Sequence, residues 1–185
     1  KTQDLDARII DIESYTTGSG LRHTIVLVPN TGASRKTWWW FYGQTPGQIG
    51  AKASERGARV MDIDSYGSGA NRRYTMVLQK NAGTGWYHYY NRTGAQVAAL
   101  VAARKARIRD LEPRGGGRYD VVLEKAPAAA WQWWYGKTRA EVIAKADQYG
   151  QRIVSLSPDG SRYAALMVRN VAAETARIDA GMESA

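Results

Sequence analysis

The sequence WWWFYGQT at residues 38–45 decides the fold of this chain. Five consecutive aromatic residues predict a β-strand, because aromatic side chains suit a pleated and packed surface. The stretch recurs as WYHYYNRT at 86–93 and as WQWWYGKT at 131–138. Each copy begins with Trp, and each has a Thr three residues after its last Tyr. The chain is therefore a tandem repeat.

Three further elements recur at matching offsets around the aromatic strand. An Arg-led strand precedes it at residues 8–13, 59–64, 107–112 and 152–157. A glycine-rich turn then leads into a second strand that begins at Arg22, Arg73, Arg118 and Arg162. A helix follows the aromatic strand, and its start is marked by the capping boxes Thr45 with Gln48, Thr93 with Gln96, and Thr138 with Glu141. Each unit is predicted to be β-β-β-α.

The predicted fold is α+β, a single repeat domain of about three and a half such units. The units are predicted at 7–57, 58–105, 106–150 and 151–185, the last one incomplete. The tail from residue 171 has no Trp and no capping Thr, so we expect a terminal cap or a frayed end there. One unit cannot bury its own faces, and neighbours should share a core. A curved or closed, propeller-like array is favoured over a straight solenoid, because closure hides strand edges.

Composition narrows the classes of protein. The chain has 185 residues and a formal net charge of +9. It has no cysteine, which excludes disulfides and thiolate metal sites. No apolar run is long enough to cross a bilayer, and no signal peptide is recognisable. The start at Lys1 rather than Met fits a processed secreted protein or a trimmed chain, and we expect a secreted protein. The charge permits a polyanion partner and also fits a solvated arginine-rich surface; nucleic acid is not favoured but not excluded.

The repeats resemble the bacterial tandem repeat family, in which a Trp-rich strand precedes a short helix, and the N-terminal repeats of the secreted fungal polyglycine hydrolases. The carriers are the Arg-led strand with Asp11, Asp62 and Asp110, the Arg-aromatic second strand, and the Trp-rich strand followed by Gly-x-Thr. The resemblance covers about residues 8–170. It implies a non-catalytic module that selects or binds a target. The hydrolases carry a separate β-lactamase-like domain with a Ser-x-x-Lys motif, and this chain lacks that tetrapeptide.

The aromatic strand offers the main candidate ligand-binding surface. Alternation places Trp38 and Trp40 on one face of the strand and Trp39 on the other. Trp38 is Trp in all three copies, which predicts shared packing, whereas the Trp39 position varies, as a solvent-facing or ligand-facing position would. One interpretation buries all these rings in the core. The other is a stacking surface for sugars, bases or peptide, formed by Trp39, Phe41, Tyr87, Tyr89, Gln132 and Trp134.

Arginines at the tips of the glycine-rich turns form a second candidate set. A phosphate loop needs glycines that lead into a helix N-terminus. These glycines lead into a strand, so the pattern favours β-hairpins. The tips still offer contacts to an anion, through Arg72, Arg73 and Arg114.

Charged residues also repeat within the Arg-led strand, where an Arg precedes an Asp by three positions at Arg8, Arg59 and Arg107. Residues three apart lie on opposite faces of a strand, so we expect each to form a structural ion pair with a neighbouring strand or unit. A pair of catalytic carboxylates is the alternative, and Ser155 at the fourth position argues against it.

No set of residues predicts a reaction, a metal site or a cofactor. His23 and His88 are the only histidines, and neither has the partners of a metal site; His88 is predicted to pack in place of Trp40. No Ser lies in a nucleophile motif. The sequence therefore predicts a non-enzymatic binding module for a protein or peptide target. The alternative is a lectin-like module for a glycan or polyanion, and an enzyme is least favoured. The oligomeric state is not predicted.

Overall fold

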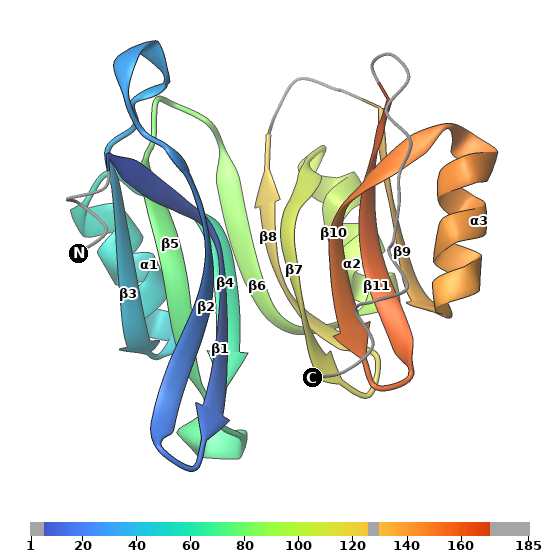
Figure 1. The fold of residues 1–185 in the computed structure, drawn as a ribbon, viewed down its shortest axis with the longest axis horizontal. Coiled ribbons are helices and arrows are strands. Elements are labelled where there is room, and N and C mark those ends of the chain that lie inside the picture. Colours follow the sequence, from blue (N-terminus) through green and yellow to red (C-terminus); the bar gives the residue numbers. More distant parts are fainter. Residues whose placement is uncertain (1–5, 126–129, 171–185) are drawn as a thin grey trace. The chain divides into compact units, whose positions relative to one another are not determined.

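The structure, a computed structural model, describes residues 6–125 and 130–170. The terminal cap predicted from residue 171 lies outside the described residues. The strands are β1 Ala7–Thr17, β2 Gly20–Pro29, β3 Trp38–Gln44, β4 Ala58–Tyr66, β5 Arg73–Lys80, β6 Trp86–Thr93, β7 Arg107–Gly115, β8 Arg118–Glu124, β9 Trp131–Lys137, β10 Gln151–Asp159 and β11 Arg162–Arg169. The helices are α1 Pro46–Glu55, α2 Gly94–Arg104 and α3 Arg139–Tyr149 (Figure 1).

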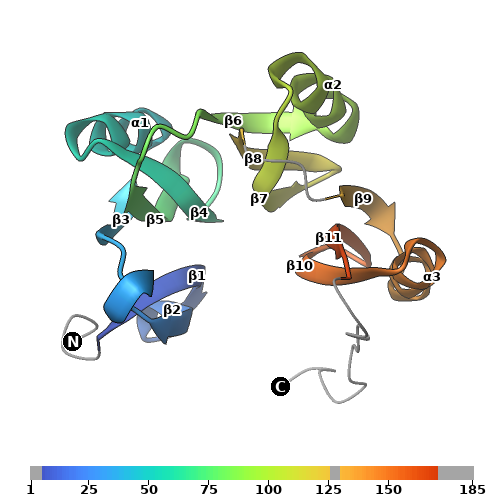
Figure 2. The same ribbon diagram turned by 90° about the horizontal axis from the view of Figure 1, so that it is seen from above.

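The predicted mixture of strands and short helices is confirmed for the described residues. They form four small sheets: sheet A (β1-β2), sheet B (β3-β5-β4), sheet C (β6-β8-β7) and sheet D (β10-β11-β9). Each three-stranded sheet has one helix, as Figure 2 shows. The chain divides into two compact units: unit 1 contains sheets A, B and C with α1 and α2, and unit 2 contains sheet D with α3.

Each three-stranded sheet combines strands from two successive sequence copies. In sheet B, the aromatic strand β3 pairs with β5, which follows it by a helix and a strand, so that Trp39 lies opposite Leu78. The same Leu78 lies opposite Val60 on β4, and β5 is therefore the central strand. The second strand of every copy takes this central place in sheets B, C and D. Sheet A has no aromatic strand among the described residues.

The predicted capping boxes are present at all three helices. The hydroxyls of Thr45, Thr93 and Thr138 each accept from the backbone N–H three residues later, and the Gln or Glu at that position accepts from the backbone N–H of the threonine. Both contacts satisfy backbone N–H groups that a helix start leaves free. Lys105 and Gly150 end α2 and α3 in the left-handed conformation.

The two faces of sheet B are covered differently. One face packs under α1, where Ile49 and Ala53 meet the buried Met76 and Leu78, with Trp39 and Phe41 partly buried against them. The opposite face carries Val77 and Met61, which pack against Ile9 and Ile12 of sheet A. Unit 2 repeats the first arrangement, since Val142 and Ala146 of α3 pack on Ala165, Met167 and Trp134. No helix of the described residues is long and apolar enough to cross a membrane.

Candidate binding groove and carboxylate stack

An open groove lies between α1 and the aromatic strand β6, within unit 1. Its volume is about 710 Å³. One wall consists of small residues of α1 and of the turn after it, and the other is the stretch Trp86–Tyr89 of β6. The lining residues are Gly50, Ala53, Ser54, Gly57, Ala58, Asn81, Trp86, Tyr87, His88 and Tyr89. Tyr87 and Tyr89 belong to the predicted ligand surface.

His88 is a polar residue in the wall that β6 contributes to this groove. Its ring lies 5.4 Å from that of Trp86 and 5.2 Å from that of Tyr90, centroid to centroid, in a row along β6. This agrees with its predicted packing role. Burial lowers the pKa of His88, so the neutral imidazole is favoured. Its buried Nδ1 has no hydrogen-bond partner in the part of the chain that the structure describes.

The backbone of β6 is also available at the groove. β6 is an edge strand of sheet C, and within the described residues β8 is its one neighbour. An edge strand presents backbone N–H and C=O groups that have no partner in the sheet. The groove therefore combines aromatic side chains, small helix residues and a strand edge.

The aromatic rings of the predicted stacking surface, those of Tyr87 and Tyr89 included, lie near the helix of their own sheet. A cation from that helix covers most of these rings: Lys52 lies 5.4 Å from the Phe41 centroid, and Arg56 lies 5.7 Å from that of Trp39. Arg104 lies 4.6 Å from the centroid of Tyr87, and its Nε donates to Tyr89 Oη at 2.6 Å. In unit 2, Lys145 lies 4.7 Å from the centroid of Trp134. The remaining predicted residue is Gln132, whose buried Oε1 accepts no hydrogen bond within the described residues.

The predicted turn arginines make contacts within unit 1. Arg72 Nη1 donates to Ser65 Oγ at 2.6 Å, and Arg73 Nη1 donates to the Arg72 carbonyl at 2.8 Å. Arg114 pairs with the buried Asp120 at 3.2 Å. The three guanidinium groups are thus part of the local structure of their turns, and the structure does not bring them together with the groove.

Carboxylates of the first strands form a stack that links the three sheets of unit 1. The Ile12 N–H of β1 donates to Asp62 Oδ2 of β4 at 3.1 Å. One step further, the Ile63 N–H of β4 donates to Asp110 Oδ2 of β7 at 2.8 Å. In β1 and β4 the register shifts at this Asp, and such a bulge redirects side chains locally. Each Asp therefore binds the backbone of the preceding sheet.

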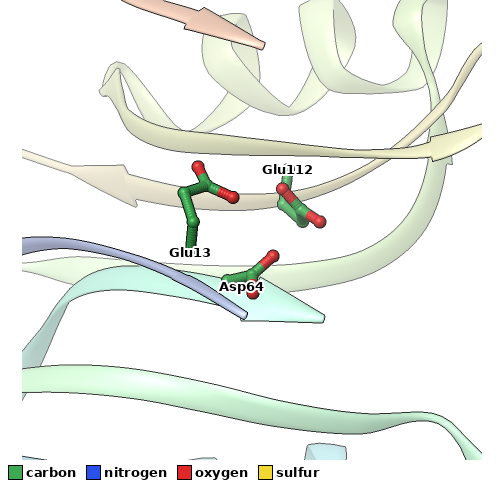
Figure 3. Close-up of side chains that lie close together, drawn as sticks. All are labelled: Glu13, Asp64 and Glu112. Carbon is green, nitrogen blue, oxygen red and sulfur yellow. The ribbon is translucent and has the colours of Figure 1, made fainter. Parts of the chain in front are cut away.

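A second row of carboxylates lies two residues further along the same strands. Glu13, Asp64 and Glu112 each have an oxygen within 4.8 Å of the others (Figure 3). The Ser14 N–H donates to Asp64 Oδ2, and Ser65 Oγ donates to Glu112 Oε1 at 3.4 Å. This row repeats the pattern of the first, in which a group of one strand donates to a carboxylate of the next.

Burial and mutual repulsion raise the pKa values throughout the stack. Burial, followed by the charge of Asp64, raises the pKa of Glu112 to about 10. Burial also raises the pKa of Asp110 to about 7. Glu13 is exposed as a residue, but partial desolvation of its carboxylate beside the other acids, and then the charge of Asp64, raise its pKa to about 7. Asp62 shifts in the same direction, through burial and then the charge of Asp110. Protonated members donate hydrogen bonds, which allows the close approach.

The oxygens of Glu13, Asp64 and Glu112 are also ligands of the type that Ca²⁺ and Mg²⁺ prefer. The chemistry of the three groups is compatible with a cation, and equally with shared protons. The raised pKa values, which follow from burial and from the neighbouring charges, favour protonated members of the row.

The repeated arginines have a partner other than the one expected. Glu124, buried at the end of β8, accepts from Arg59 Nη1 at 2.9 Å and from Arg107 Nη2 at 2.6 Å. Arg59 lies on sheet B, so this is an ion pair between sheets, as expected, but its acid comes from the second strand. Asp62 and Asp110 bind backbone N–H groups of the preceding sheet instead.

The carboxylate stack was missed by the sequence interpretation, although a signal existed. Asp11 and Glu13 are two residues apart, as are Asp62 and Asp64, and residues two apart lie on one strand face. The third pair is Asp110 with Glu112. Because the three pairs occupy the same place in successive repeats, they predict two rows of carboxylates, one formed by the first members and one by the second. The sequence interpretation used the spacing of three between Arg and Asp and not the spacing of two between the carboxylates.

No known protein-family model matches the chain, and no curated protein matches it either. The function is therefore argued from the groove and from the contacts around it.

Proposed function

We propose that the chain is a non-enzymatic binding module, and that the groove between α1 and β6 holds an extended segment of a protein or peptide target. The observation that carries this proposal is the groove of about 710 Å³ that follows an edge strand. Grooves lined by apolar and aromatic side chains with a few polar groups are the usual form of ligand sites. A strand edge adds backbone partners for a second extended chain.

The surroundings of the aromatic rings favour a peptide over a sugar. A sugar stacks on an open ring face, but Arg104 lies over Tyr87 and already donates to the hydroxyl of Tyr89. A peptide needs no open ring face, because it uses the strand edge and the space beside it. Ser54 and His88 add polar side chains to the lining of that space.

Substitutions at two glycines of α1 test the proposal with a matched control. Gly50 lines the groove, and a Cβ there would lie 3.5 Å from His88 Cε1, an ordinary contact. A leucine at this position would take up space in the groove beyond that Cβ. Gly47 lies on the same helix and would place a Cβ in open space, so Gly47→Leu is the control.

The probe is a set of linear peptides selected from a random displayed library on the wild-type chain. We expect Gly50→Leu to weaken their binding by at least about tenfold, a loss of roughly 1.4 kcal/mol, and Gly47→Leu to leave it unchanged. Equal binding to all three proteins, each shown to be folded by circular dichroism, would place the peptides elsewhere and refute the groove as the site.

A polyanion is the second candidate ligand, and the net charge of +9 is the observation that favours it. Heparin and soluble chitin oligosaccharides are suitable probes. Binding of heparin that falls steeply with salt, with no effect of Gly50→Leu, supports the polyanion function. Competition by the neutral oligosaccharide supports the lectin-like function.

Two sequence predictions are carried forward as part of the proposal. The repeats support a curved or closed, propeller-like array, which small-angle X-ray scattering of the chain tests. The resemblance to the repeats of secreted hydrolases supports a secreted location, which detection of the protein in culture medium tests.

A further inference from the structure

Within residues 6–125 and 130–170, sheet A has two strands, whereas each of the other sheets has three. In sheets B, C and D the central strand has an aromatic strand on one edge and an Arg-led strand on the other. In sheet A, β2 holds the place of the central strand and pairs with β1 alone among the described residues. The register makes the equivalence plain, since Val28 lies opposite Arg8 as Val168 lies opposite Arg152. The free edge of β2 is the place of an aromatic strand.

Ile25 and Val26 of β2 are exposed, whereas their equivalents on β5 are covered by α1 on one face of the sheet and by sheet A on the other. Ile25 is 37% exposed, whereas the equivalent Met76 on β5 is fully buried at 0%. Val26 is 45% exposed, against 1% for Val77. These are β-branched residues of a strand with a free backbone edge, which is the kind of edge that takes up another strand.

We propose that the free edge of β2 is a strand-addition site that takes up an aromatic strand–helix segment of a further repeat unit of this kind. The site is separate from the groove between α1 and β6, so this inference goes beyond the proposed function. The occupant is inferred from three copies of the same contact within the chain, at β3, β6 and β9.

The three copies also define how the added segment pairs. In sheet D, Trp131 lies opposite Val168 and Gln132 opposite Met167. By the equivalence of β11 and β2, the same Trp would lie opposite Val28 and the following residue opposite Leu27. Arg169 donates its N–H to the Ala130 carbonyl at 2.9 Å, so alternate residues from Arg169, namely Met167 and Ala165, direct their N–H groups to β9. On β2 the corresponding groups belong to Leu27 and Ile25.

Pro29 makes this edge different from the others in one respect. It holds the position of Lys80, Lys125 and Arg169, whose N–H groups donate to the residue before each aromatic strand. Proline has no N–H, so the added strand has one backbone hydrogen bond fewer at this end. The contact at β2 is therefore weaker than its internal copies, which suits a segment that binds and dissociates.

The test uses the full chain and a synthetic peptide with the sequence of residues 130–149, which spans β9 and α3. Binding is measured by fluorescence anisotropy of the labelled peptide, and its location by amide hydrogen exchange. We expect saturable binding with protection of the Ile25 and Leu27 amides. Two N-methylated peptides sharpen the test. Methylation at Gln132 removes the N–H that faces Leu27, and methylation at Trp133 removes one that faces away.

We expect the Gln132 methylation to weaken binding at least about tenfold and the Trp133 methylation to have little effect. Absence of binding, equal effects of the two methylations, or protection confined to β11 through exchange with β9 would each overturn the proposal. So would self-association of the chain without peptide, with Ile25 and Leu27 protected, because the occupant would then be a second copy. Binding that Gly50→Leu abolishes would instead locate the peptide in the groove.

Discussion

Sheets A and B contain the same pair of strands in two different surroundings. In both, an Arg-led strand pairs with a second strand in the same register, with a bulge at the same Asp. Sheet B adds β3 and α1, and its central strand is buried. The part of the chain that the structure describes gives sheet A no such strand or helix, and Ile25 and Val26 are exposed. The hairpin is thus formed by its own two strands, and burial of its second strand depends on a helix over one face and a preceding sheet over the other.

Truncation of the equivalent core side chains should give the largest difference between the two sheets. Met76→Ala removes a fully buried side chain under α1, and we expect a loss of about 2–5 kcal/mol in the free energy of unfolding. Ile25→Ala at the equivalent position of β2 should lose less than about 1 kcal/mol, because that side chain is partly exposed already. Urea unfolding of both variants measures this. Equal losses would mean that the edge of β2 is covered in solution.

The carboxylate stack should make stability depend on pH in a definite direction. Because the pKa of Glu13 is raised from 4.5 to about 7 and that of Glu112 from 4.5 to about 10, the folded chain binds more protons than the unfolded chain between these values. The contribution is complete below about 4.5 and is lost as the pH rises through about 7 and then about 10. We expect unfolding in urea to require less denaturant at pH 8 than at pH 5.

Two variants locate this pH dependence. Glu112→Gln mimics the protonated form and should flatten the pH dependence, by an amount on the order of 1 kcal/mol because solvent reaches the Glu13 end of the stack. Glu55→Gln on the surface of α1 is the control and should leave the slope unchanged. An unchanged slope in Glu112→Gln would show that the stack is not the group that titrates. This prediction also bears on the comparison of the two sheets, because the row joins the exposed Glu13 of sheet A to the buried Asp64 of sheet B.

Loss of the cap of α1 should weaken sheet B and leave the hairpin of sheet A in place. Thr45→Ala removes the acceptor for the Gln48 N–H, and we expect a cost of about 1 kcal/mol. Hydrogen exchange should show faster opening of α1 and β3, with the β1–β2 amides unchanged. Faster exchange in β1 and β2 as well would mean that the two sheets open together.

The smallest expected effect comes from Gly50→Ala. Glycine within a helix costs backbone entropy, and an added Cβ here makes an ordinary contact with His88. We expect a gain of about 0.5–1 kcal/mol, measured as an increase in the midpoint of thermal unfolding. A loss would show that the position of the added Cβ lies closer to His88 Cε1 in solution than the 3.5 Å of the structure.

Much of the local structure could be predicted from the sequence. The positions of the strands follow from aromatic and β-branched runs, and the helix starts follow from Thr45, Thr93 and Thr138 with their Gln or Glu partners. These signals are local, because a capping box or a strand propensity depends on neighbouring residues alone.

The partner of each strand could not be predicted in the same way. Nothing in the sequence around Trp38 indicates that it lies opposite Gln79 of the next copy, since pairing between copies depends on the path of α1 and β4. The cations over Trp39 and Tyr87 were missed for the same reason: Arg56 and Arg104 are 17 residues away in each case, at the far end of the helix. The carboxylate rows, in contrast, were predictable from spacing alone.

The offset between sequence copies and sheets has a consequence for how such chains change in length. A sheet takes its aromatic strand from one copy and its other two strands from the next. A duplication or deletion of one whole period, wherever in the period the break falls, therefore leaves an aromatic strand, a helix and two strands in succession at every internal position. Recombination can therefore change the number of sheets while every internal sheet keeps the same composition.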